Sequence, residues 1–208
     1  MKQSIRAKLE YVCSAGDGWV RLGAVAPEIA RHAAPGQFVQ VRAWDGSIPL
    51  LRRPFSIAAA HADGTISLIV KTVGPATKII SNLTRGDTMD IIGPLGTSFR
   101  APAPGEKIFL AAGGVGIAPL RFFIHNSLET GREEPGTGPD FTLFYGSATA
   151  SEAVVLQDEL LDRIRTIQAT EDGSAGERGL VTLPLGKEIS ASRPHRLLTC
   201  GPAPMMKA

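Results

Sequence analysis

Residues 107–120 combine a strand-like run, closely spaced glycines and the start of a helix, and they restrict the fold of the second half of the chain more than any other segment. Ile108–Ala112 is apolar, and Gly113, Gly114 and Gly116 follow it directly. Such a turn points bare backbone N–H groups and the positive end of a helix at one place, which suits a pyrophosphate. A glycine-rich turn alone is a weak indication, because many strand-to-helix turns carry glycine for steric reasons.

A second candidate site for an anion lies upstream, in Leu51–Ile57, which the sequence places in a turn between two strand-like runs. Arg52 and Arg53 lie close to Phe55, and a guanidinium group is almost never fully buried without an anion to pair with. The ring and the hydroxyl of Ser56 suit a ligand with a phosphate at one end and a flat heteroaromatic group at the other, and a flavin nucleotide fits. An exposed strand that ends in solvated arginines fits these residues as well. The glycine-rich turn downstream favours the nucleotide.

Composition narrows the class of protein. The 208 residues are 43% hydrophobic and 20% charged, which is enough for one large or two modest domains with cores of their own. A formal charge of +2, without a cluster of lysines or arginines, argues against nucleic acid as a partner. No apolar run approaches the ~18 residues of a membrane span and no signal peptide is visible, so we expect a soluble, cytoplasmic protein with no membrane partner.

Cysteine usage excludes two kinds of structure. Cys13 and Cys200 are the only cysteines in the chain. They imply no disulfide framework, and they cannot supply the four ligands of an iron–sulfur cluster. We therefore expect no metal site on this chain alone.

The first half of the chain has the pattern of an antiparallel β-barrel. Short strand-like runs are separated by turn residues, and they cover Ile5–Cys13, Trp19–Val25, Gln37–Arg42, Gly64–Lys71 and Gly86–Ile92. Such strands are typical of a closed barrel. A short helix over residues 78–83 is predicted after Val73–Thr77, and its first amides are available to an anion. The proline-rich stretch Ala101–Gly105 marks a boundary, so the barrel domain is expected to span residues 1–100.

The second half changes character. Apolar or mixed strand-like runs alternate with helical segments, and the runs cover Ile108–Ala112, Phe141–Tyr145, Arg165–Ala169 and Arg196–Thr199. The clearest helical segments are residues 120–128 and 151–164, the second with Ser151 as its N-cap. This alternation predicts a doubly wound parallel sheet over residues 101–208, with ligands at the carboxyl ends of the strands.

Three motifs, in this order along the chain, resemble the ferredoxin–NADP reductase superfamily. They are Arg53–Ser56, Gly113–Pro119 and Cys200–Pro202. Within the superfamily, Gly93–Phe99 and Cys200–Met206 are similar to the electron-transfer subunit of dihydroorotate dehydrogenase B. The resemblance implies FAD on the barrel domain and NAD on the second domain.

The resemblance also implies an activity and a partner. The chain is expected to pass electrons between FAD and NAD, for dihydroorotate oxidation in pyrimidine biosynthesis. Its partner would be an FMN-containing dihydroorotate dehydrogenase catalytic subunit or another redox protein, in a hetero-oligomer. A reductase subunit of a hydrogenase or ferredoxin-type complex, a stand-alone flavin reductase and a non-enzymatic nucleotide-binding module are the alternatives.

Site residues follow from the matched motifs. Arg53 corresponds to the arginine that binds the FAD phosphates, and Ser56 to the residue that hydrogen-bonds the flavin N5 edge. Cys200 corresponds to a cysteine that lies near the nicotinamide C4 and flavin N5, where it positions rather than attacks. Ser56 and Cys200 are therefore the expected catalytic residues, opening onto a shared crevice. The expected cofactor-binding residues are Arg53, Pro54, Phe55, Ser56, Ile69, Val70, Lys71, Gly74, Ala76 and Thr77 for FAD, and Gly113, Gly114, Val115, Gly116, Gly201 and Pro202 for NAD.

The chain departs from the family pattern at three places. Phe55 stands where tyrosine is commonest, which removes a hydroxyl contact to the cofactor but keeps the ring. Pro75-Ala76 stands where glycines are commoner. The [2Fe–2S] cluster of the full-length family member lies on cysteines C-terminal to the matched region, and this sequence stops at Ala208, so we expect a truncated chain rather than a lost cluster.

Two loops favour NAD over NADP. A 2′-phosphate needs arginine or lysine, whereas a free ribose diol prefers an acidic acceptor. Gly146–Thr149 contains no arginine, and Thr170–Ser174 contains two acids, Glu171 and Asp172. Arg178 is the residue that could reverse this preference.

Overall fold

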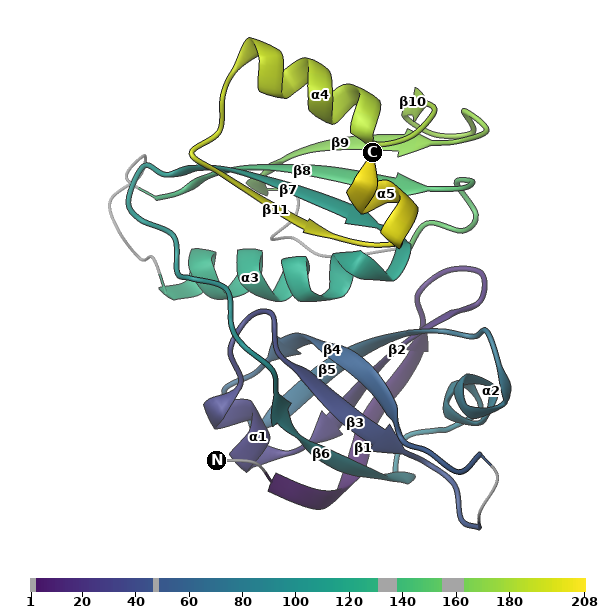
Figure 1. Ribbon diagram of the computed structural model, residues 1–208. Coiled ribbons are helices and arrows are strands. Elements are labelled where there is room, and N and C mark those ends of the chain that lie inside the picture. The colour runs from purple at the N-terminus through teal and green to yellow at the C-terminus, as the bar shows by residue number, and fades with distance from the viewer. Residues whose placement is uncertain (1–2, 47–48, 131–137, 155–162) are drawn as a thin grey trace. The chain divides into compact units, whose positions relative to one another are not determined.

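The computed structural model describes residues 3–46, 49–130, 138–154 and 163–208. It divides into two compact units, Met1–Phe99 and Arg100–Ala208 (Figure 1). The predicted order of an antiparallel barrel followed by a parallel sheet is confirmed. No helix among the described residues is long and apolar enough to span a membrane.

The first unit is a closed barrel with the strand order β1-β2-β5-β4-β3-β6. The strands are β1 (Gln3–Ser14), β2 (Trp19–Val25), β3 (Phe38–Arg42), β4 (Arg53–Ala60), β5 (Thr65–Lys71) and β6 (Thr88–Leu95), and the helices are α1 (Pro27–His32) and α2 (Pro75–Ser81). Every strand pair in it is antiparallel. Arg53–Ile57, which the sequence placed in a turn, instead begins strand β4.

Burial in the barrel follows the side-chain alternation of its strands. In β3, Val39 and Val41 are buried, whereas the other three residues of the strand are only partly buried. Strand β5 is different, because six consecutive residues from Thr65 to Val70 are buried. Helices α1 and α2 both contact β5, which explains why its second face is also covered.

The second unit is a five-stranded parallel sheet with the order β10-β9-β8-β7-β11. The strands are β7 (Lys107–Gly113), β8 (Asp140–Ser147), β9 (Arg165–Thr170), β10 (Glu177–Arg178) and β11 (Arg196–Cys200). A 3₁₀ turn η1 (Gly114–Gly116) leads into α3 (Ile117–Thr130), and α4 (Thr182–Ala191) and α5 (Ala203–Lys207) follow later. Figure 1 shows α3 and α4 on opposite faces of this sheet.

The predicted helix over residues 151–164 is wrong at its start, because residues 151–153 form a turn and a bend and residue 154 has no regular structure. Residues 155–162 lie outside the described part of the chain. Helix α4 was not singled out from the sequence, since it contains Pro184 and Gly186, two residues that disfavour helix interiors.

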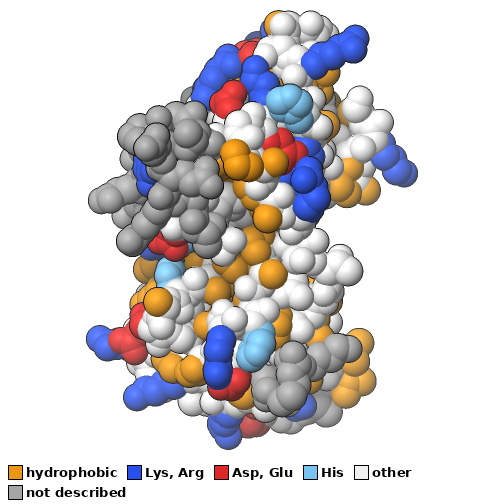
Figure 2. Space-filling model, turned by 90° about the vertical axis from the view of Figure 1, so that its left-hand side faces the viewer, with side chains coloured by type: hydrophobic (Ala, Val, Ile, Leu, Met, Phe, Trp, Pro, Cys, Tyr) orange, Lys and Arg blue, Asp and Glu red, His pale blue; other side chains and the backbone are white. Residues whose placement is uncertain are grey.

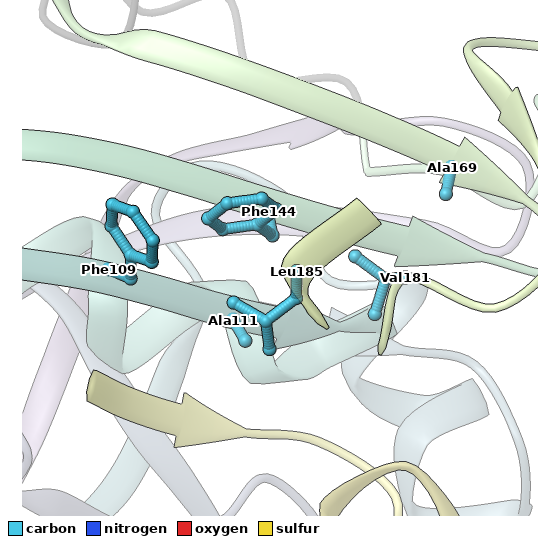
Figure 3. Packing of buried hydrophobic residues seen from close by; sticks show 6 residues of the cluster. All are labelled: Phe109, Ala111, Phe144, Ala169, Val181 and Leu185. Carbon is cyan, nitrogen blue, oxygen red and sulfur yellow. The ribbon is translucent and has the colours of Figure 1, made fainter. Parts of the chain in front are cut away.

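Each face of the second sheet has its own apolar layer. Under α4, a cluster of buried residues joins β7, β8 and β9 to the start of the helix: Phe109, Ala111, Phe144, Ala169, Val181 and Leu185 (Figure 3). The rings of Phe109 and Phe144 lie 5.3 Å apart and tilted by 60°, a favourable aromatic geometry. On the α3 side, Phe123 packs edge-on against Phe141 at 5.8 Å.

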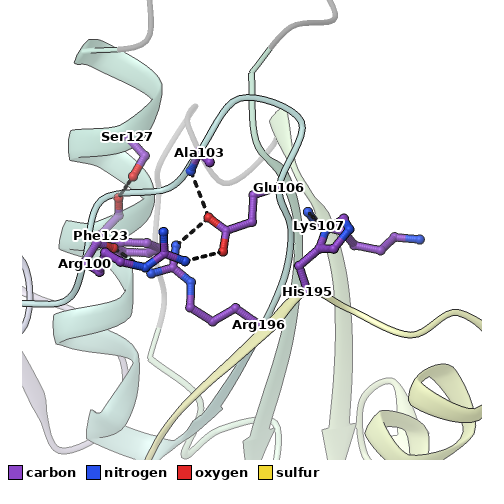
Figure 4. Close-up of polar contacts among 8 residues, drawn as sticks. All are labelled: Arg100, Ala103, Glu106, Lys107, Phe123, Ser127, His195 and Arg196. Atoms are coloured by element: carbon purple, nitrogen blue, oxygen red, sulfur yellow. Dashed lines mark hydrogen bonds and ion pairs between the residues drawn. The ribbon is translucent and has the colours of Figure 1, made fainter.

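A buried carboxylate fastens the start of the second unit to strand β11 (Figure 4). Glu106 accepts a hydrogen bond from the Ala103 N–H group at 2.8 Å and forms ion pairs with Arg100 at 2.8 Å and Arg196 at 3.0 Å. Burial acts to raise the pKa of the Glu106 carboxyl group, but the N–H group and the two guanidinium groups outweigh it, so the pKa lies below its ordinary value. We call Arg100, Glu106 and Arg196 the Glu106 clasp.

Candidate cofactor-binding sites

The two arginines at the start of strand β4 have different roles. Arg52 donates to the backbone oxygen of Asp90 at 2.9 Å, and its other terminal nitrogen lies 3.5 Å from the Asp90 carboxylate. Arg53 donates only to the Leu51 carbonyl at 3.2 Å and pairs with no carboxylate among the described residues. A cation without an anion is a candidate phosphate ligand. The matched motif singled out Arg53, but the pairing of Arg52 could not be predicted, because Asp90 comes from a different strand.

Phe55 and Ser56 follow on β4, and both are partly buried. Ser56 lies opposite Phe38 of β3. Within the described part of the chain its hydroxyl group forms no hydrogen bond, so the bond to the backbone that a strand-end serine often makes is not formed there. The hydroxyl can both donate and accept, and it therefore fits the N5 edge of a flavin.

The side chain of Thr77 holds the loop before α2 together through hydrogen bonds. The Thr77 hydroxyl oxygen accepts hydrogen bonds from the Val73 and Gly74 N–H groups at 2.9 and 3.0 Å, and the hydroxyl donates to the Gly74 carbonyl at 3.0 Å. Ala76 and Thr77 are buried, whereas Pro75 is exposed and a Cβ at Gly74 would meet no atom within 4 Å. Thr77 thus supports the loop from within, and the open surface lies at Gly74 and Pro75.

The end of β5 is held inside the barrel. Ile69 and Val70 are buried, and the Lys71 ammonium group lies 5.3 Å from the centre of the buried Trp19 ring. A cation over an aromatic face is a stabilising arrangement. The lysine is therefore used by the barrel itself.

In the second unit, three glycines at the end of β7 and in η1 are required for different reasons. Gly114 has φ +51°, a left-handed conformation that favours glycine. A Cβ at Gly113 would lie 2.7 Å from the Met205 sulfur and 2.9 Å from Pro202 Cδ. A Cβ at Gly116 would overlap the carbonyl group of Cys200.

These contacts bring the turns after β7 and β11 together at the carboxyl edge of the sheet. The two strands are direct neighbours, with Cys200 opposite Ala112. All the residues predicted for NAD from the two motifs lie in these adjoining turns, which we call the glycine cradle (residues 113–116 and 200–202). Helix α3 begins at the cradle, so its N-terminal amides face the same edge. The cradle thus fits a pyrophosphate.

Cys200 is partly buried, and burial raises the pKa of its thiol. The protonated thiol is a poor nucleophile. This agrees with a positioning role rather than covalent attack.

The acidic loop after β9 is tied to the loop after β8. Asp172 accepts hydrogen bonds from the Ser174 N–H group at 2.9 Å and from its hydroxyl at 2.6 Å, and both hold the pKa of Asp172 below its ordinary value. The Ser174 hydroxyl oxygen in turn accepts from the Ala150 N–H group at 2.7 Å. Asp172 therefore shapes the loop, and the exposed Glu171 is a candidate acceptor for a ribose diol. The Arg178 side chain packs against Gly173: its Cβ, Cγ and Cδ atoms lie within 3.1 Å of the position that a Cβ at Gly173 would take.

No group of three or more histidine, cysteine or acidic side chains that could hold a metal ion occurs in the described ranges. On the face shown in Figure 2, blue and red side chains are interspersed, so no field of one sign is visible there.

Comparisons with known proteins agree with this arrangement. Residues 21–99 match the oxidoreductase FAD-binding domain family, and residues 110–208 match the oxidoreductase NAD-binding domain family. The expected oxidoreductase with FAD and NAD as cofactors is confirmed by these two matches. A structure of an NADH-dependent reduced ferredoxin-NADP oxidoreductase, studied for flavin-based electron bifurcation, has a TM-score of 0.80 and 28% identity, covering 97% of this chain and 69% of that one.

A ferredoxin NADP+ reductase from Neisseria gonorrhoeae with bound FAD and NADP shares the fold, with a TM-score of 0.74 and 19% identity over 98% of this chain and 87% of that one. The dihydroorotate dehydrogenase B (NAD(+)) electron transfer subunit of Desulforamulus reducens is 36% identical over 184 residues, covering 88% of this chain and 67% of that protein. The corresponding subunit of Bacillus velezensis is 36% identical over 186 residues, covering 87% of this chain and 68% of that protein. The chain thus spans about two thirds of the length of these relatives. It belongs to the family of dihydroorotate dehydrogenase B electron transfer subunits, within the ferredoxin–NADP reductase superfamily.

Proposed function

We propose that this chain is the flavoprotein part of a dihydroorotate dehydrogenase, in which electrons pass between FAD on the barrel and NAD on the parallel-sheet unit. FAD, when bound, supplies the chemistry: it exchanges a hydride with nicotinamide and single electrons with an iron–sulfur partner. The observations that support the proposal are one on each unit: Arg53 on the barrel pairs with no described carboxylate, and the glycine cradle on the sheet brings two turns into close contact.

The protein's own residues would bind and orient the two cofactors. Arg53 would neutralise the FAD phosphates, helped by the open loop surface at Gly74. Ser56 would donate to the oxidised flavin N5 or accept from reduced N5–H, because a hydroxyl can do either. The glycine cradle would bind the NAD pyrophosphate through backbone N–H groups, and Cys200 would support the nicotinamide through its small, polarisable side chain. No general base is required.

The partner and the setting are part of the same proposal. The family consists of electron transfer subunits, so a catalytic partner is implied. We propose that this partner is an FMN-containing dihydroorotate dehydrogenase subunit in a hetero-oligomer, in the cytoplasm. A [2Fe–2S] cluster would connect the flavins, on cysteines that this chain does not contain.

The test is the flavin content of purified protein after reconstitution with FAD. We expect Arg53→Ala to lose FAD, because the phosphates lose their cation. Arg52→Ala is the matched control, since Arg52 is paired with Asp90, and it should keep its FAD. Full flavin content in Arg53→Ala would refute the assignment of Arg53. Failure of the unaltered chain to bind FAD would refute the proposed function.

A further inference from the structure

Strand β11, which ends at Cys200, is held on one side only. In the described part of the sheet, β7 is its single neighbour. None of the five residues of β11 is buried, whereas six of the seven residues of β7 are. Burial therefore fixes the position of β7 but contributes little to that of β11.

The side-chain pattern of β11 does not determine its register either. A slip of one residue turns every side chain of a strand to the opposite face. Leu197 lies on the more exposed face, and Leu198 lies on the other. Because either register would place one leucine on the inner face, hydrophobic burial hardly distinguishes between them.

Polar contacts at the start of β11 do distinguish between registers. Arg196 donates through one terminal nitrogen to the Arg100 carbonyl at 2.7 Å and through the other to the Glu106 carboxylate at 3.0 Å. Its guanidinium group also lies 5.5 Å from the centre of the Phe123 ring. Next to it, Lys107 donates its N–H to His195 Nδ1 at 2.9 Å, and the His195 N–H donates to the Lys107 carbonyl at 2.9 Å.

We propose that Glu106 and Arg196 are positioning residues for the glycine cradle. By fixing the register of β11 against β7, they place the Cys200 carbonyl against Gly116. Arg196 and Cys200 stand at opposite ends of β11, about 13 Å apart at the usual rise of a strand, so neither clasp residue needs to touch the cofactor. A slip of one residue would move Cys200 by about 3.3 Å and turn its thiol to the more exposed face.

The contacts at position 196 require two separate N–H donors on one side chain. The guanidinium group reaches a carbonyl and a carboxylate with separate nitrogens in a fixed plane, and an ammonium group offers a single point charge instead. Lysine at position 196 should therefore keep the attraction to Glu106 and lose part of the directional control.

Cys200 itself reports on the register. In a Cys13→Ser background it is the only thiol of the chain, so its rate of reaction with a disulfide reagent can be measured in the folded protein, well below its unfolding temperature. We expect Arg196→Gln to raise this rate several-fold and Arg196→Lys to raise it less.

Arg100→Ala is the matched control, because it removes an ion pair from the same carboxylate but leaves the Arg196 contacts, and it should not change the rate. A folded Arg196→Gln variant with an unchanged thiol rate would overturn the proposal. If that variant does not fold, an unchanged rate in Arg196→Lys would do so.

A second measurement concerns the nucleotide and rests on the proposed function. With FAD bound, Arg196→Gln should raise the KM for NADH while flavin content stays at the level of the unaltered chain. A variant that is only less stable would show neither the thiol change nor the KM change at low temperature. If the thiol rate rises in Arg196→Gln but NADH does not reduce the flavin of the unaltered chain or of any variant, the register proposal stands and the proposed function fails.

Discussion

Gly116 and Cys200 are in such close contact that no side chain fits between them: a Cβ at Gly116 would overlap the Cys200 carbonyl group. Gly116 belongs to the turn after β7, and Cys200 ends β11, so the contact joins two segments 84 positions apart in the sequence. The close packing of these two turns forms the glycine cradle.

Replacing Gly116 by alanine should therefore push the two turns of the glycine cradle apart. Overpacking of a tight contact costs about 1–3 kcal/mol, and we expect both a lower unfolding temperature and weaker NADH binding. Gly186→Ala is the control, because a Cβ there meets no atom within 4 Å and alanine favours the helix. Its stability should rise slightly and its NADH affinity should not change. An unaltered NADH affinity in Gly116→Ala would contradict the account of the cradle.

Ser56→Ala should slow the reduction of bound FAD without destabilising the barrel. Its hydroxyl has no partner among the described residues, so the fold loses nothing when it is removed. A neutral hydrogen bond such as this one to the reacting N5 is worth about 0.5–1.5 kcal/mol, which corresponds to about a twofold to tenfold loss in rate. Rapid mixing with NADH measures this rate. Ser67→Ala provides the contrast: Ser67 is buried and bonded to Tyr11 at 2.6 Å, so its loss should lower stability and leave the rate unchanged.

Thr77→Ala should weaken FAD binding by loosening the loop before α2. The N–H groups of Val73 and Gly74 lose their common acceptor, at a cost of about 1–3 kcal/mol. Thr77→Ser keeps the hydroxyl and should retain both stability and FAD affinity. Fluorescence titration with FAD compares the two variants, and equal affinities would show that the threonine hydroxyl does not order this loop.

Glu106 should make the second unit sensitive to acid. Its pKa is lowered in the folded protein relative to the ordinary value of 4.5. The stabilisation is therefore complete above the pKa of the unfolded chain and is lost as the pH falls through the lower, folded value. The difference in free energy of unfolding between the unaltered protein and Glu106→Gln should be largest near neutrality and shrink as the pH falls below 4.5. Urea unfolding at several pH values gives this difference.

The comparison with Glu106→Gln is needed because the pKa values of other carboxyl groups are lowered as well. The pKa values of Asp63, Asp172 and Glu188 are also lowered, so the whole protein should lose stability in acid. Subtracting the variant isolates the contribution of Glu106. A difference that stays constant from neutral pH into acid would contradict the prediction.

The sequence predicted the features that depend on local patterns. Alternation in β3 and the strand-to-glycine-to-helix turn at residues 113–116 are local signals, and both structures form as expected. The sequence could not show what Arg52 does, because its partner is Asp90, 38 positions away. It also treated the acids of residues 171–172 as equivalent, although the Asp172 carboxylate accepts hydrogen bonds from Ser174 within its loop.

Glu106 was missed for a related reason. It follows a proline-rich connection that offers nothing to bury, and a single acid there is usually solvated. Its burial depends on Arg196, 90 positions later. Contacts between distant segments of this kind have no periodic signature, and only the folded arrangement reveals them.

The central claim is that one FAD, bound through Arg53 on the barrel, and one NAD, bound at the glycine cradle, take part in a single redox reaction. Anaerobic mixing of the FAD-loaded chain with NADH tests this directly, with the visible absorbance of the flavin as the readout. The account predicts that the flavin absorbance bleaches with one NADH consumed per FAD. A chain that binds both FAD and NADH and yet keeps its oxidised flavin spectrum would contradict it.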